Sequence, residues 1–257
     1  MPGDALGVVA RLAGWGPRPA ASPAEARAHR FMGRSFRAAG LRVAVQRFAV
    51  PGRGGSRNVI GVLDTPRSCL RIVMAHADTA AGAPGANDNA SGLAVLWALA
   101  RRLERIRPWC DVWLAATGSE ERVYTGSADH LGALALARRA RARGGRQRLR
   151  YALSIDEVGG NRPFWLRSPV GAPRARVEGV LLRAGRDAGV PVSWVRDEGD
   201  GNSDHREFQL LGLPAAKLGV GAGGEPCRHL PCDRAERLDP RSLAQARRLV
   251  ARALRAR

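Results

Sequence analysis

Lysine is nearly absent from this sequence, and its basic character comes from arginine. Only Lys217 is a lysine among 42 basic residues, and the formal net charge is +19 with a pI of about 11.6. Such a charge could attract a nucleic acid or another polyanion. The densest arginine clusters, residues 138–150 and 241–257, contain no aromatic side chain on which a base could stack. We therefore expect solvated basic faces and no nucleic-acid partner, with a polyanion-binding surface as the alternative.

Long hydrophobic runs are also missing. No apolar run approaches the ~18–20 residues that a membrane-spanning helix requires, so we expect no membrane span. The first residues carry neither a basic leader nor a long apolar segment, and we expect no secretory signal peptide. A cytoplasmic location is the default expectation, with secretion as the alternative if the N-terminus is incomplete. The sequence gives no indication of the oligomeric state.

Cysteine is scarce, with four residues in the chain. Cys69 and Cys110 lie beside predicted strands, where we expect them to be small buried hydrophobic residues. Cys227 and Cys232 flank His229, and they could form a short disulfide or remain free thiols. Because no C-x-x-C pair occurs, a structural zinc site with four cysteine ligands is excluded.

Strand-like segments alternate with helical ones along the chain, which predicts an α/β fold with three layers (αβα). Helices should cover both faces of a twisted, mixed, mainly parallel sheet. With 257 residues, 45% of them hydrophobic, we expect an N-terminal arm over residues 1–21 and a single domain over residues 22–257. The expected strands cover residues 41–50, 58–63, 71–75, 112–116, 151–155, 191–195 and 214–220, and the main helices residues 23–39, 90–103, 126–137, 175–188 and 240–254.

One polar stretch, His76 to Gly92, stands out because it directly follows a buried strand. It contains His76, Asp78 and Asp88, and its glycines and proline let the loop fold back so that Asp88 can approach His76. In open α/β sheets, ligands bind at the carboxyl ends of the strands. An imidazole and carboxylates in one loop at that edge suit a borderline metal ion such as zinc.

Ligand-type side chains follow other predicted strands as well, and we expect these strand ends to lie side by side. Together they offer enough ligands for two metal ions that share one carboxylate: His76, Asp88, Glu121, Asp156 and His229. Asp88, on the central loop, is the expected bridge. Without metal, three carboxylates in one crevice would repel one another, and bound cations remove that conflict.

The adjacent acids Glu120 and Glu121 point in different directions after a strand, so they can take different roles. We assign Glu121 as a metal ligand and Glu120 as the general base that accepts a proton from a metal-activated water. Asp78 can accept the ring N–H of His76 that does not face the metal. The catalytic candidates are therefore Glu120 and Asp78.

Each of these residues also has an ordinary structural explanation. Taken alone, Glu120 and Glu121 would be a solvated acidic pair. Asp156 would be a turn or helix cap, and His229 a surface histidine. For His205 we favour a structural role in its loop. The metal-site hypothesis depends on the joint occurrence of these residues, each after a predicted strand.

The motifs around these residues resemble those of the co-catalytic di-zinc aminopeptidases of metallopeptidase clan MH, the leucyl aminopeptidase-like and aminopeptidase Y-like zinc exopeptidases. The resemblance covers roughly residue 22 to the C-terminus and agrees with the predicted fold. The motifs are His76-Ala-Asp78, Gly85-Ala-Asn-Asp88-Asn-Ala-Ser-Gly92, Glu120-Glu121, Ile155-Asp156, Ser203-Asp204-His205 with Phe208, Gly212-Leu-Pro214-Ala215 and His229-x-Pro231-x-Asp233.

The resemblance implies a role for each ligand. In the family pattern, His76 and Asp156 bind one zinc ion, and Glu121 and His229 bind the other. Asp88 bridges the two ions. Such a set implies two zinc ions as cofactors and a peptide with a free amino terminus as the partner.

The predicted function is that of a zinc-dependent aminopeptidase with its catalytic domain over residues 22–257. A metal-bridging water attacks the amino-terminal peptide bond, and Glu120 is the general base. The alternatives are cyclisation of amino-terminal glutamine or small-amide hydrolysis at the same site, and polyanion binding through the basic faces. The residues after Glu121, Arg-Val-Tyr-Thr-Gly-Ser, depart from the family's small, leucine-rich turn. The preferred amino-terminal residue is therefore left open.

Overall fold

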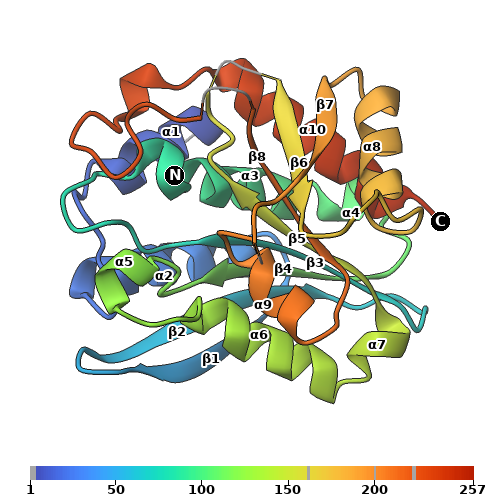
Figure 1. The fold of residues 1–257 in the computed structure, drawn as a ribbon, viewed down its shortest axis with the longest axis horizontal. Coiled ribbons are helices and arrows are strands. Elements are labelled where there is room, and N and C mark those ends of the chain that lie inside the picture. The colour runs from blue at the N-terminus through green and yellow to red at the C-terminus, as the bar shows by residue number, and fades with distance from the viewer. Residues whose placement is uncertain (1–3, 161–162, 200, 222–223) are drawn as a thin grey trace.

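A twisted sheet of eight strands forms the centre of the molecule (Figure 1). The computed structural model describes residues 4–160, 163–199, 201–221 and 224–257. The strand order is β1-β2-β4-β3-β5-β8-β6-β7, and the four central strands run parallel to one another. The strands are β1 (Arg42–Val50), β2 (Gly54–Leu63), β3 (Leu70–His76), β4 (Asp111–Thr117), β5 (Leu149–Asp156), β6 (Phe164–Ser168), β7 (Val192–Arg196) and β8 (Ala215–Val220).

Helices cover both faces of this sheet, which confirms the predicted three-layer α/β architecture. One face packs against α1, α2, α3, α8 and α10, and the other against α6 and α9. The larger helices are α1 (Ala5–Ala13), α2 (Pro23–Ala38), α3 (Ser91–Ala100), α6 (Leu131–Ala142), α8 (Glu178–Asp187), α9 (His205–Leu210) and α10 (Pro240–Arg255), and the single-turn ones are α4 (Leu103–Ile106), α5 (Arg122–Thr125) and α7 (Gly145–Arg148). Among the described residues, none of the helices is both long and apolar enough to cross a membrane.

Local sequence signals fix the ends of the longest helices. The hydroxyl of Ser22 accepts a hydrogen bond from the backbone N–H of Glu25, and Pro23 occupies the first turn of α2, as its sequence predicted. Asp239 caps α10 in the same way. These helices bury apolar side chains against the sheet, and this burial provides most of their stability.

The predicted elements differ from the structure in three places. The helix predicted over 126–137 begins later, as α6 over Leu131–Ala142, and the separate α5 before it ends at a turn at Gly126. The helix α6 also extends past the predicted end to Ala142, into the first arginine cluster, because alanine and arginine both favour the helix. Strand β6 was not predicted, because five residues between proline-containing turns give too short a pattern.

The N-terminal residues pack against the sheet layer next to the polar loop after β3. Val8, Val9 and Leu12 of α1 are fully buried in the main core. The buried guanidinium of Arg18 donates hydrogen bonds to backbone carbonyls of Leu12, Ala77, Pro84 and Gly85. Because three of these carbonyls belong to the loop after β3, the N-terminal segment helps to hold that loop in place.

All four cysteines are paired. Cys69 and Cys110 are buried as expected, but they form a disulfide rather than packing as free thiols. The reason is the register of the adjacent parallel strands β3 and β4, which pairs Leu70 with Asp111 and so brings the preceding residues together. Cys227 and Cys232 form a second disulfide, one of the two states that the sequence left open.

Candidate metal centre

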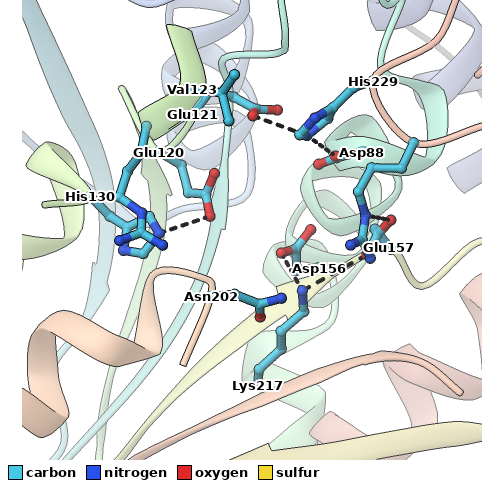
Figure 2. Close-up of a pocket in the computed structure, with 12 residues that line it drawn as sticks. Asp88, Glu120, Glu121, Val123, His130, Asp156, Glu157, Asn202, Lys217 and His229 are labelled. Atoms are coloured by element: carbon cyan, nitrogen blue, oxygen red, sulfur yellow. Dashed lines mark hydrogen bonds and ion pairs between the residues drawn. The ribbon is translucent and has the colours of Figure 1, made fainter. Parts of the chain in front are cut away.

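The carboxyl ends of three neighbouring strands form the floor of the site. In the sheet, β3 lies between β4 and β5. His76 is the last residue of β3, Asp156 is the last residue of β5, and Glu120 and Glu121 follow β4 by a few residues. The long segment after β8 brings His229 over the same edge (Figure 2). The structure thus places the five predicted ligands together.

Asp88 lies between two groups of potential ligands. Its Oδ1 is 3.2 Å from Nε2 of His76, and its Oδ2 is 3.3 Å from Nε2 of His229. The His76 ring also lies 3.5 Å from Oδ1 of Asp156, and the His229 ring 3.1 Å from Oε2 of Glu121. One carboxylate therefore faces two sets of ligands, with one oxygen toward each.

These contacts define two triads with the spacing of a metal site. His76, Asp88 and Asp156 form one triad and Asp88, Glu121 and His229 the other; within each triad one ligand atom per residue lies within 4.8 Å of the others. A third group with that spacing joins His76 to Glu120 and Glu121. We favour the two triads because their members meet in direct side-chain contacts and share Asp88.

The ligand atoms of the two triads are better suited to bind a cation than to form hydrogen bonds with one another. Nε2 of His76 and Oδ1 of Asp156 are buried and have no hydrogen-bond partner among the described residues. Imidazole nitrogens and carboxylate oxygens are normal zinc ligands. Unpaired buried polar atoms are costly, and a bound metal ion would satisfy both of them.

The electrostatics point the same way. The carboxylates of Asp88 and Glu121, which can accept the ring N–H of His229, raise the pKa of His229 to about 10. Burial alone would lower the pKa of His76, but Glu120, Asp156 and Asp88 raise it well above its usual value. Burial raises the pKa of Asp88, yet the neighbouring rings of His229 and His76 bring it down to about 2. The crevice thus favours positive charge, and a metal ion that binds there would displace the ring protons.

Two hydrogen bonds to Asp233 hold the loop that carries Asp88 in place. The carboxylate of Asp233 accepts hydrogen bonds from the backbone N–H groups of Asn87 (2.7 Å) and Asp88 (3.0 Å). Gly85 opens the turn with φ of +63°, and a Cβ there would lie 2.5 Å from the carbonyl oxygen of Asp88. These contacts fix the position of Asp88 between the two triads.

Asp78 acts differently from the sequence-based expectation. Its carboxylate accepts hydrogen bonds from the backbone N–H groups of Glu120 and Glu121, both at 3.0 Å, and lies 3.7 Å from Nδ1 of His76. The ring N–H donates instead to the backbone carbonyl of Asp78, at 3.1 Å. The carboxylate of Asp78 therefore holds the turn after β4. The backbone carbonyl of Asp78 binds Nδ1 of the His76 ring, so Nε2 of the same ring faces the metal site.

Glu120 lies on the opposite wall of the cavity from Asp156 (Figure 2). Its Oε1 is 3.4 Å from Nε2 of His130, and Nδ1 of His130 is 2.9 Å from Oε1 of Glu207. Burial raises the pKa of Glu120 well above its usual value. Glu120 therefore has the position and the proton affinity of a general base.

Four other residues near the ligands were missed in the sequence. His130 contacts Glu120, while Lys217, Glu157 and Arg228 form an ion-pair group beside Asp156. The sequence did contain an indication for two of them. Glu157 directly follows the predicted ligand Asp156, and Lys217 is a charged residue on an otherwise apolar strand. His205 bonds to Asp197 at 2.6 Å within its own loop, in agreement with the structural role expected for it.

Two curated relatives share part of this sequence. Leupeptin-inactivating enzyme 1 of Streptomyces exfoliatus is 27% identical over 187 residues, which are 72% of this chain and 40% of that protein. Aminopeptidase YwaD of Bacillus subtilis is 28% identical over 216 residues, 77% of this chain and 44% of that protein. This chain therefore spans less than half the length of the two relatives.

Solved structures share the fold at low sequence identity. BSAP, a zinc aminopeptidase from Bacillus subtilis, has a TM-score of 0.86 and 18% identity, over 97% of this chain and 93% of that one. A glutaminyl cyclase from Bacteroides thetaiotaomicron has a TM-score of 0.83 and 19% identity, over 100% and 98% of the two chains. The family model that matches is that of peptidase family M28, and it covers residues 58–254. That match takes in most of the chain and both triads, and the chain belongs to peptidase family M28.

Proposed function

We propose that this protein is a zinc-dependent aminopeptidase that removes the amino-terminal residue of a peptide. The observation that carries the proposal is the carboxylate of Asp88, with one oxygen toward each of two ligand triads. Membership of peptidase family M28 and the similarity to relatives named as aminopeptidases support it.

Two zinc ions suit this arrangement. One ion would be held by His76, Asp88 and Asp156, and the other by Asp88, Glu121 and His229. When bound, zinc polarises a carbonyl group and makes a water molecule a better nucleophile at neutral pH. The two triads support a count of two ions, because a single ion would leave one triad without a cation.

Glu120 moves the proton in this proposal. It accepts a proton as the water oxygen attacks the carbonyl carbon, and gives it to the amine nitrogen when the C–N bond breaks. Its buried position and raised pKa suit a group that takes up a proton and releases it again during the reaction. Glu121, whose Oε2 faces His229, keeps the second triad in place.

The cavity over the site suits the end of a chain. Its volume is about 190 Å³, below the roughly 300–1,000 Å³ of typical ligand pockets. A cavity of this size suits one residue better than an extended peptide segment. The acidic side chains of Asp88, Glu121 and Asp156 line the cavity and would attract a free amino group, which favours substrates with an unblocked amino terminus.

The substitution Glu120→Gln tests the assignment of the general base. It should lower kcat on aminoacyl anilides by about 10²-fold or more, because the amide cannot accept the proton. Zinc content, measured by atomic emission on the purified protein, should stay at the wild-type value. The exposed Glu104→Gln on α4 is the matched control. Near-wild-type turnover in the Glu120→Gln protein would overturn the role of Glu120.

Cyclisation of amino-terminal glutamine is the second candidate, favoured by the similarity of the fold to a glutaminyl cyclase. Offering both a glutaminyl peptide and aminoacyl anilides to the same zinc-loaded protein separates the two reactions. Release of free amino acids supports the aminopeptidase, and formation of pyroglutamyl peptide without release supports the cyclase.

We also infer that the protein works in an oxidising compartment, rather than in the cytoplasm that was the default expectation. The support is its two disulfides, since such bonds are rare in proteins of the reducing cytosol. Fractionation of the producing cells, followed by detection of the protein with an antibody, tests this inference. Recovery from the cytosolic fraction with free thiols would contradict it.

A further inference from the structure

The direction of the substrate in the cavity follows from the position of Glu120, if the function proposed above holds. Glu120 must reach the nitrogen of the leaving amine, so the leaving part of the peptide lies on the side of Glu120 and His130. The amino-terminal residue then lies toward the opposite wall, where Asp156, Glu157 and Lys217 are found (Figure 2). The chemistry of that wall decides which amino-terminal side chain fits.

An ion-pair group forms this wall. Arg228 donates from Nε to Oε1 of Glu157 at 2.7 Å, and its Nη2 binds Oε2. Nζ of Lys217 lies 2.8 Å from Oδ2 of Asp156 and 3.8 Å from Oε2 of Glu157. Lys217 is therefore paired mainly with Asp156, and Arg228 with Glu157. The two positive and two negative charges of the wall balance, so the exposure of each group decides which charge a substrate meets.

Exposure shows which of these groups a substrate can reach. The side chain of Glu157 is 1% exposed and that of Lys217 6% exposed, whereas that of Arg228 is 38% exposed. A substrate therefore meets the guanidinium of Arg228 and not the carboxylate behind it. A basic side chain would be repelled here, because the acidic partner is already bound and covered.

Aliphatic side chains are scarce among the described residues that line this cavity. Among the described residues that line the cavity, Val123 is the only aliphatic one, and it lies with Glu120 and Glu121 on the opposite side (Figure 2). A leucine side chain against Arg228 would remove water from the exposed guanidinium without replacing its hydrogen bonds. A carboxylate would instead accept charge-assisted hydrogen bonds from Arg228.

From this geometry we propose that the enzyme prefers an acidic amino-terminal residue, with Arg228 as the group that binds its carboxylate. The inference rests on the proposed aminopeptidase function and names its substrate class. The side chains of glutamate and glutamine have nearly the same shape. A difference in cleavage between glutamyl and glutaminyl substrates would therefore report on the charge of the side chain.

The test uses the zinc-loaded protein and the anilides of glutamate, glutamine, leucine and lysine. We expect kcat/KM for the glutamyl substrate to exceed that for the glutaminyl one by roughly 10–100-fold. Arg228→Met should bring this ratio close to one, while Arg228→Lys should keep most of it. The matched control is Arg122→Met, which lies in the same cavity beside Glu121 and should leave the ratio unchanged.

The outcomes separate this inference from the proposed function. If leucyl anilide is cleaved as well as glutamyl anilide, or if Arg228→Met leaves the ratio unchanged, the inference is wrong and the aminopeptidase function stands. If no anilide is cleaved, that function fails. Binding of L-glutamate and L-leucine, measured by calorimetry on the same protein, is a readout independent of turnover. Tenfold tighter binding of L-glutamate supports the acidic site, and equal binding overturns it.

Discussion

His130 shows how one side chain can affect the reaction without touching a ligand. It is 1% exposed and lies between two carboxylates, with Nδ1 bonded to Glu207 at 2.9 Å and Nε2 3.4 Å from Glu120. Glu207 also accepts hydrogen bonds from the backbone N–H of His130 and from the guanidinium of Arg206. These bonds fix Glu207, which in turn fixes the orientation of the His130 ring. The ring therefore limits the positions that the carboxylate of Glu120 can adopt.

We predict that His130→Phe lowers kcat by about tenfold, the usual effect of losing one hydrogen-bonding contact. KM and zinc content should change little, because His130 is not a ligand. His130→Gln should restore part of the activity, since its amide can still contact Glu120. Steady-state kinetics with metal analysis check this. A loss that is equal in the two variants, or that follows zinc content, would show a purely structural role.

At this scale the sequence predicts ligands better than it predicts their neighbours. His76 and Asp156 could be identified because each ends an apolar strand, and parallel strands share one edge. His130 could not, because its contact with Glu120 depends on the turn at Gly126 that ends α5 before α6 begins. The role of Asp78 was also misjudged, since nothing in the pattern shows that its carboxylate binds backbone N–H groups.

The segment between β8 and α10 is the element on which the second triad depends. It contains no strand among its described residues, and His229 adopts the left-handed region with φ of +60°. Cys227 and Cys232 close a short loop around Arg228 and His229. Such a covalent constraint lowers the entropy that the loop loses when His229 binds a metal ion.

We predict that the double substitution of Cys227 and Cys232 by serine weakens zinc binding by about 10–100-fold, as disruption of groups that orient a ligand commonly does. The protein should remain folded, because this loop lies outside the main core. Competition with a chromophoric chelator measures the affinity. Substitution of Cys69 and Cys110 by serine is the matched control, and an unchanged affinity in the first variant would argue against the constraint.

Over the whole molecule, the alternation of helices and strands could be predicted except for β6, whereas the pairing of Cys69 with Cys110 could not. Alternating apolar and helical patterns predict the layers, since only a few topologies satisfy them. Predicting the Cys69–Cys110 disulfide requires knowing that β3 pairs with β4 and that Leu70 lies opposite Asp111, and the sequence pattern does not give this register. The same holds for Arg228, whose pairing with Glu157 joins residues 71 positions apart.

The two disulfides act at opposite ends of the central strands, so their effects should separate. Cys69 and Cys110 precede β3 and β4, whereas the ligands follow the carboxyl ends of these strands. The bond closes a loop with a sequence separation of 41 residues, which in the chain-entropy model stabilises the fold by about 4 kcal/mol. We predict that replacing both residues by alanine lowers the free energy of unfolding by about this amount, with kcat and zinc affinity unchanged. Denaturant unfolding without reductant measures it, and an unchanged midpoint would show that the strands alone hold this end of the sheet together.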